Sequence, residues 1–242
     1  MTRRLLITRQ PADCTELQTL LDPHDIVLWP YPVLRVEDVA DLSGWRTVLQ
    51  HVEVAAAEPW LMMASPRAPA RFVQQCRERD TENLLDLPLA VIGDGTAAAA
   101  FAAGLEPALV GPGTGLGLAE AVTERLGASR STVIFACGHD RRPELPDALG
   151  RAGFTVVPVV VYRMRATPSE DLPTLAPDLD GVIVTSPRAV SLYLAAVGGR
   201  PLPHAHWALG PTTQDAARAL GVDCLTPDRP TMESLAEELC RT

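Results

Sequence analysis

The sequence predicts an α/β protein built on parallel sheets. Short apolar runs alternate with stretches of helical periodicity along all 242 residues, which is the pattern of strand–helix units. One such unit occurs twice, as Leu61-Met-Met-Ala-Ser-Pro-Arg-Ala-Pro69 and as Val182-Ile-Val-Thr-Ser-Pro-Arg-Ala-Val190. Each copy reads as a strand that passes into a helix, and open parallel sheets place their ligand sites at such exits.

The first unit is predicted as strand, helix and strand over residues 4–9, 11–21 and 25–29. Leu17, Leu20 and Leu21 fall at helical spacing, and Pro11 marks a helix start. The stretch from Leu34 to Gly44 is polar and is expected to be irregular. Further strands are predicted at 60–64, 88–93, 108–110, 132–135, 154–162, 181–185, 206–210 and 222–226. Further helices are predicted at 45–52, 66–77, 94 to the stop at Gly104, 117–126, 144–152, 188–197, 212–220 and 231–241.

Charge and composition exclude several functions. The net charge of −9 disfavours nucleic acid as a partner. All 21 basic residues are arginine. The absence of lysine excludes the phosphate loop that ends in Gly-Lys-Ser/Thr, and it excludes Schiff-base chemistry.

Neither a metal site nor a membrane segment is predicted. The five cysteines lack Cys-x-x-Cys spacing, and His204 and His206 have no acidic or cysteine partner nearby. No apolar run approaches the roughly 18 residues that span a bilayer, and the Arg-containing start reads as a strand rather than a signal peptide. We therefore expect a cytoplasmic protein.

The glycine-rich run Gly111–Gly117 resembles a dinucleotide loop, but Gly-x-Gly-x-x-Gly fails in every register. We interpret this run as a flexible loop over a cleft or as a turn.

The chain contains an internal duplication in three segments. A shift of 121 residues relates Ser65 to Ser186, and a shift of 117 relates Gly93 to Gly210. The same 117-residue shift relates Thr114 to Thr231 and Leu118 to Leu235, while a shift of 128 relates Glu16 to Glu144 and Pro30 to Pro158. The order of units is compatible with two tandem domains that divide near residue 128 or with one domain inserted in the other.

Several short motifs, in their order and spacing, resemble the uroporphyrinogen-III synthase family over nearly the whole chain. They are Leu6-Ile-Thr-Arg-Gln-Pro11, Gly153-Phe-x-Val-x-x-x-x-Val-Tyr162, Thr185-Ser-Pro-Arg-Ala-Val190, Gly210-Pro-Thr-Thr213 and Pro230-Thr-x-x-x-Leu235. The resemblance implies two flavodoxin-like parallel-sheet domains joined by two extended linkers near Leu34 and Tyr162, with the active-site cleft between them. It places domain one at 1–34 and 166–242, and the inserted domain two at 35–165.

The resemblance also implies an activity, which is the cyclisation of hydroxymethylbilane to uroporphyrinogen III with loss of water and inversion of the last pyrrole ring. No cofactor is expected. We expect a monomer that acts on this small molecule, and a transient contact with hydroxymethylbilane synthase stays open. The alternatives are a non-catalytic relative that binds a tetrapyrrole or another anion, and a nucleotide-dependent enzyme on a flavodoxin-like fold.

Tyr162 matches the tyrosine that the family is thought to use in assisting departure of the substrate's hydroxyl group. A phenol is protonated at neutral pH and can donate to a leaving oxygen. Helix N-termini and arginines could hold the substrate's carboxylates. The predicted substrate-binding residues are Thr8, Arg9, Ser65, Arg67, Gly93, Thr96, Gly138, Arg142, Thr185, Ser186, Arg188, Gly210, Pro211, Thr212 and Thr213.

The turn after residue 135 and the threonine pair 212–213 each allow a second interpretation. Many relatives have a Pro-Arg-Gly-like turn where this chain has Ala136-Cys137-Gly138, so Arg141 and Arg142 are the substitutes to consider. Thr212 and Thr213 are also expected to cap a helix. The two serines are not expected to be nucleophiles, because no histidine lies in a matching motif.

Overall fold

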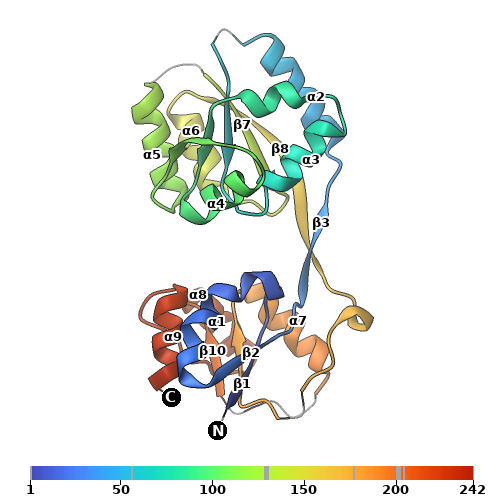
Figure 1. Cartoon of the computed structure of the whole chain (residues 1–242), viewed down its shortest axis with the longest axis vertical. Helices are drawn as coiled ribbons and strands as arrows, with labels where there is room; N and C mark the ends of the chain where they lie inside the picture. Colours follow the sequence, from blue (N-terminus) through green and yellow to red (C-terminus); the bar gives the residue numbers. More distant parts are fainter. Residues whose placement is uncertain are drawn as a thin grey trace. The chain divides into compact units, whose positions relative to one another are not determined.

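The chain forms two compact units. The computed structural model describes residues 2–55, 57–127, 131–176, 178–199, 203 and 205–241. Unit 1 comprises Met1–Arg35 and Arg165–Thr242, and unit 2 comprises Val36–Met164 (Figure 1). The chain passes between the units within two strands, β3 (Leu34–Asp38) and β8 (Thr155–Ala166). Within the described ranges, no helix combines the length and the apolar character needed to cross a membrane.

Unit 1 contains a four-stranded parallel sheet in the order β10-β9-β1-β2. Its strands are β1 (Arg3–Ile7), β2 (Ile26–Pro30), β9 (Gly181–Val184) and β10 (Ala205–Ala208). The predicted strand over 222–226 is wrong, because only Leu225 pairs there, in a single parallel bridge to Trp207. Pro227 follows two residues later and has no N–H to extend the ladder.

Two helical layers cover this sheet. Leu5 and Ile7 of β1 pack with helices α1 (Thr15–Leu21) and α9 (Met232–Arg241), whereas Leu6 packs with α7 (Pro187–Val197) and α8 (Pro211–Ala219). Successive side chains of a strand point to opposite faces, so the continuous apolar run supplies both cores.

Unit 2 contains a six-stranded sheet in the order β3-β8-β7-β4-β5-β6. The four strands not yet described are β4 (Trp60–Met63), β5 (Leu89–Val91), β6 (Pro107–Val110) and β7 (Thr132–Gly138). Helices α2 (Leu42–Glu53), α3 (Pro69–Arg77) and α4 (Asp94–Ala102) contribute to one core cluster, and α5 (Gly115–Leu126) and α6 (Glu144–Arg151) to another.

Four segments in or next to unit 2 differ from the predicted ones. The stretch 34–44, expected to be irregular, contains β3 and the start of α2. β7 continues through residue 138, where a loop was expected, and β8 continues beyond Tyr162 to Ala166. The run 111–117 ends inside α5, which begins at Gly115.

The internal duplication is confirmed by the strand registers. β1 lies between β2 and β9 in unit 1, and β7 lies between β8 and β4 in unit 2. The order β2-β1-β9-β10 of unit 1 therefore matches the order β8-β7-β4-β5 of unit 2. The shifts of 128, 121 and 117 residues convert the pairs of unit 1 into those of unit 2. The corresponding pairs are Ile7–Pro30 and Phe135–Pro158, Ile7–Ile183 and Phe135–Met62, and Val184–Ala208 and Met63–Val91.

The last helices of the two repeats have the same N-cap. The hydroxyl oxygen of Thr114 accepts a hydrogen bond from the N–H of Gly117 at 3.1 Å, and that of Thr231 accepts one from the N–H of Ser234 at 3.3 Å. These are the cap-to-N3 bonds that Ser and Thr provide.

The two Ser-Pro-Arg exits, in contrast, are not equivalent. Ser186 caps α7, accepting a hydrogen bond from the N–H of Ala189 at 3.2 Å, and the N–H of Val190 donates to the carbonyl of Ser186. In the other copy the position of Val190 is taken by Pro69, which has no N–H to donate. The helix predicted from residue 66 therefore begins only at Pro69, where a proline is well tolerated.

Replacing either cap threonine should cost similar stability. We expect Thr114→Ala and Thr231→Ala each to lower the free energy of unfolding by about 0.5–2 kcal/mol, since each removes the acceptor for one N-terminal N–H. Thr212→Ala, at an exposed position in the first turn of α8, is the control and should change it by less than about 0.5 kcal/mol. Urea titration measures the free energy of unfolding of all three variants. A loss of stability in only one of the two cap variants would contradict the equivalence of the α5 and α9 caps.

Candidate functional site

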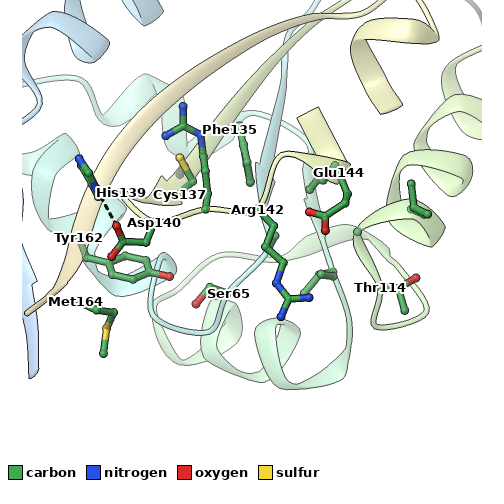
Figure 2. A pocket seen from close by; sticks show the side chains of 18 of the residues that line it. Ser65, Thr114, Phe135, Cys137, His139, Asp140, Arg142, Glu144, Tyr162 and Met164 are labelled. Atoms are coloured by element: carbon green, nitrogen blue, oxygen red, sulfur yellow. Dashed lines mark hydrogen bonds and ion pairs between the residues drawn. The ribbon is translucent and has the colours of Figure 1, made fainter. Parts of the chain in front are cut away.

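A pocket of about 700 Å³ lies within unit 2, at the carboxyl ends of its central strands (Figure 2). It is lined by the end of β7, by residues after β4, β5 and β7, by β8, and by residues at the start of α5 and α6. The lining residues include Ser65, Ile92, Thr114, Cys137, Gly138, His139, Asp140, Arg142, Glu144, Tyr162 and Met164.

The topology explains why a pocket forms there. The crossover after β7 leads through α6 to β8, and the crossover after β4 leads through α3 to β5 in the opposite direction along the sheet. Helices therefore diverge from the carboxyl ends of two adjacent strands, β7 and β4. Such a switch point is where open α/β sheets bind ligands.

Tyr162 lies directly on Gly138. A Cβ at Gly138 would lie 2.7 Å from Cζ and 2.9 Å from Oη of the tyrosine. The carbonyl of Tyr162 accepts a hydrogen bond from the N–H of His139 at 2.8 Å. Tyr162 is only 9% exposed, and Figure 2 shows its hydroxyl directed into the pocket.

Charged and hydrogen-bonding groups line the same pocket. The guanidinium of Arg142 points into the pocket (Figure 2). Nδ1 of His139 and a carboxylate oxygen of Asp140 lie 3.0 Å apart. The N-terminus of α5 lies at the pocket with its first residue, Gly115, and its cap, Thr114. Helix N-termini favour anions, so this wall and Arg142 suit a carboxylate.

Cys137 lies in the pocket wall as a neutral thiol. Burial raises its pKa to about 11, an effect that the nearby Arg141 opposes. Its sulfur lies 3.6 Å from the carbonyl oxygen of Val159. Because the thiolate is the reactive form, Cys137 is not a nucleophile at neutral pH.

The pocket brings together four of the predicted site residues, namely Ser65, Gly138, Arg142 and Tyr162. The other three of unit 2 lie outside its lining. Arg67 donates its backbone N–H to the hydroxyl of Ser65 at 3.3 Å. Gly93 is the N-cap of α4 and packs against Gly113, and Thr96 is buried within α4.

In unit 1, the predicted residues after β1 and β9 are joined by hydrogen bonds. The buried hydroxyl of Thr8 donates to the carbonyl of Ile183 at 3.3 Å and accepts from the N–H of Thr185 at 3.4 Å. A guanidinium nitrogen of Arg9 lies 3.5 Å from the sulfur of Met232. Ser186 is the N-cap of α7, and the exposed Arg188 is in its first turn.

The predicted capping role of Thr212 and Thr213 is wrong. Gly210 occupies the N-cap position of α8, and Pro211 is its first residue. Thr212 is exposed in the first turn, whereas Thr213 is buried. A glycine at the cap leaves the backbone N–H groups of this turn without a side-chain acceptor of their own.

The pocket residues that were not predicted from the sequence include Thr114, His139, Asp140, Glu144 and Met164. Thr114 carried a usable signal, since the duplication relates it to Thr231. His139 and Asp140 follow an apolar run, as site residues after parallel strands do, but the end of that strand was placed three residues too early.

No group of three or more potential metal ligands among His, Cys, Asp and Glu occurs in the part of the chain that the structure describes. His204 lies outside the described residues.

Comparison with known proteins identifies the family. Residues 15–237 match the family described as Uroporphyrinogen-III synthase HemD. The chain belongs to the uroporphyrinogen-III synthase family. The members of this family are lyases of heme biosynthesis. No protein with a curated functional description matches the sequence.

Two solved structures of the same family support the fold. A uroporphyrinogen-III synthetase from Helicobacter pylori aligns with a TM-score of 0.62 at 13% identity, covering 100% of this chain and 99% of that one. A mutant uroporphyrinogen III synthase from the extremely thermophilic bacterium Thermus thermophilus aligns with a TM-score of 0.57 at 19% identity, covering 99% of this chain and 98% of that one. The predicted α/β fold of parallel sheets is confirmed.

The contact between Gly138 and Tyr162 predicts the effect of one added methyl group. Gly138→Ala should displace the tyrosine ring or the strand, and we expect it to lower the free energy of unfolding by about 1–3 kcal/mol through overpacking. Gly95→Ala is the matched control, because a Cβ there meets nothing within 4 Å and alanine favours the helix by about 0.5–1 kcal/mol. Denaturant unfolding measures both, and equal stability of the two variants would contradict the packing.

Proposed function

We propose that this chain cyclises hydroxymethylbilane to uroporphyrinogen III, losing water and inverting the last pyrrole ring. The observation that carries the proposal is the hydroxyl of Tyr162, directed into a pocket at the switch point of a unit whose family has this activity. The two units are proposed to be the enzyme's domains, with unit 2 inserted in unit 1.

Tyr162 is proposed to donate a hydrogen bond to the departing hydroxyl. The pyrrole nitrogen supplies the electrons that expel this group, so the tyrosine needs only to stabilise the leaving oxygen. A nearly buried phenol is suited to this task, because a hydrogen bond in an environment of low dielectric constant is stronger than one in bulk solvent.

The larger task is orientation. Hydroxymethylbilane is flexible, and the product depends on which carbon of the last ring attacks. Holding reacting atoms in one geometry can supply several kcal/mol of the barrier. We propose that Arg142, Ser65 and the N-terminus of α5 bind the substrate's carboxylates in unit 2.

The remaining predicted contacts are retained in the proposal. In unit 1 they lie after β1, β9 and β10, at the ends of the strands that correspond to β7, β4 and β5. They are Thr8, Arg9, Thr185, Ser186, Arg188, Gly210, Pro211, Thr212 and Thr213, to which Arg67, Gly93, Thr96 and Gly138 are added in unit 2.

We also propose that the enzyme works as a cytoplasmic monomer. The five cysteines are free thiols, four of them buried, which fits a reducing compartment. Light scattering in solution should give the mass of one chain, 25.9 kDa.

The direct test supplies hydroxymethylbilane and identifies the porphyrin isomer after oxidation. We expect the type III isomer to predominate, with the type I isomer, the product of unassisted closure, in the minority. Type I alone would contradict the proposal. If the protein then still bound hydroxymethylbilane, the chain would be a binding relative without catalysis.

Tyr162→Phe should lower kcat about 10- to 100-fold and leave KM nearly unchanged, because it removes one donor to the leaving group and keeps the ring. This magnitude reaches only the low end of the general-acid contribution, since the substrate's own electrons expel the group. Tyr193→Phe is the control, as Tyr193 is buried in unit 1, and its kcat should match that of the wild type. Full turnover by Tyr162→Phe would remove the proposed role.

A further inference from the structure

The strand that carries Tyr162 contains an irregularity just before it. Along β7 and β8, Cys137 pairs with Val160, but the next residue, Gly138, pairs with Tyr162. Val161 is thus an extra residue on β8. Such β-bulges redirect the side chains that follow them, and they are frequent next to active sites.

The bulge changes the face to which Tyr162 belongs. Up to and including the bulged residue, Val157, Val159 and Val161 pack in the cluster with α2, α3 and α4, while Val156 and Val160 pack in the cluster with α5 and α6. Regular alternation would place Tyr162 with Val160. Instead, Tyr162 packs in the same cluster as its neighbour Val161, and its ring lies on Gly138.

The carbonyl of the bulged residue is held from outside the sheet. It accepts a hydrogen bond from the side-chain Nε2 of Gln75 at 3.0 Å and a longer one from the N–H of Val39 at 3.3 Å. The neighbouring N–H of Val160 donates to a carboxylate oxygen of Asp41 at 3.1 Å. Both lone pairs of the bulge carbonyl are therefore used.

Gln75 is itself fixed. Its side-chain oxygen accepts a hydrogen bond from Nε1 of Trp45 at 3.0 Å, which orients the amide so that its nitrogen faces Val161. Gln75 is 5% exposed and Trp45 is 3% exposed. Trp45 stacks on Phe72 with ring centroids 5.4 Å apart. The Gln75 amide is therefore held by α2 and α3 on one side and bonded to β8 on the other.

We propose that Gln75 is a positioning residue for Tyr162. Through the bulge carbonyl it fixes the backbone from which the tyrosine ring extends over Gly138 into the pocket. Its importance for catalysis rests on the proposed function, whereas its effect on the geometry of Tyr162 does not.

The geometric effect can be measured without substrate. The chain has three tyrosines, Tyr31, Tyr162 and Tyr193, so labelling with 3-fluorotyrosine gives three fluorine environments, and the Tyr162→Phe variant assigns one of them. Gln75→Met keeps the length of the side chain and removes its donor. We expect it to shift or broaden the Tyr162 resonance and to leave the other two unchanged.

Gln74→Met is the matched control, because the adjacent Gln74 is exposed and its amide bonds to Glu78 at 2.8 Å. It should leave all three resonances in place. Trp45→Phe keeps a ring against Phe72 and frees the Gln75 amide, and it should shift the same Tyr162 resonance. An unshifted Tyr162 signal in a folded Gln75→Met or Trp45→Phe protein overturns the proposal.

Kinetics then separate positioning from a general loss of structure. Gln75→Met should lower kcat about 10-fold, less than the roughly 100-fold that a 1 Å misplacement can cost, with little change in KM. In a Tyr162→Phe background the same substitution should have almost no further effect, as expected for residues that act together. If the two substitutions instead lowered kcat by the product of their separate factors, the positioning role of Gln75 would be overturned. Failure of the wild type to make the type III isomer would instead refute the proposed function and leave the fluorine result intact.

Discussion

The parallel pairing of β7 on both of its edges is the constraint on which the rest of unit 2 depends. All seven of its residues are buried, and its neighbours β4 and β8 run in the same direction. Parallel neighbours require crossovers, and burial on both faces requires helices on both sides of the sheet. These demands account for the two helical layers. They also account for the pocket, since the crossovers after β7 and β4 diverge and leave the carboxyl ends of these two strands uncovered.

The two repeats have kept their registers and diverged at their strand ends. The pairs Ile7–Pro30 and Phe135–Pro158 correspond across 128 residues, and burial on both faces makes any slip of one residue costly. Beyond these prolines the repeats separate. β2 ends at Pro30, whereas β8 continues through the bulge at Val161 to Ala166. Binding groups can change at strand ends without disturbing the core. Tyr162, whose hydroxyl Figure 2 shows directed into the pocket, lies in this diverged part of β8.

Much of this architecture could be predicted, because periodicity and repetition are local properties of the sequence. The duplication related the strands of the two units, the strand-exit rule located Ser65, and the family resemblance located Gly138, Arg142 and Tyr162. Other features depend on single residues whose effect is not periodic. Pro69 delays α3 because one N–H is absent, and Leu225 pairs alone because Pro227 follows it. Gln75 could not be found from the sequence. A polar residue in an amphipathic helix is normally exposed, whereas Gln75 is buried and bonded to Trp45 and to the carbonyl of Val161, contacts that the sequence does not reveal.

The insertion of unit 2 has a consequence for the order in which the protein can acquire its structure on the ribosome. β1 lies between β2 and β9, but β9 begins only at Gly181, after the whole of unit 2. At about 5–20 residues per second, the nascent chain carries β1 for roughly 10–35 s before this partner strand is made. A pair of strands is marginally stable in water, and Leu5, Leu6 and Ile7 lack most of their final neighbours during that interval. Unit 2, continuous from Val36 to Met164, is completed first. β1 is thus made before unit 2 but gains its second partner strand after it, and its apolar residues are the segment that a chaperone would have most reason to shield.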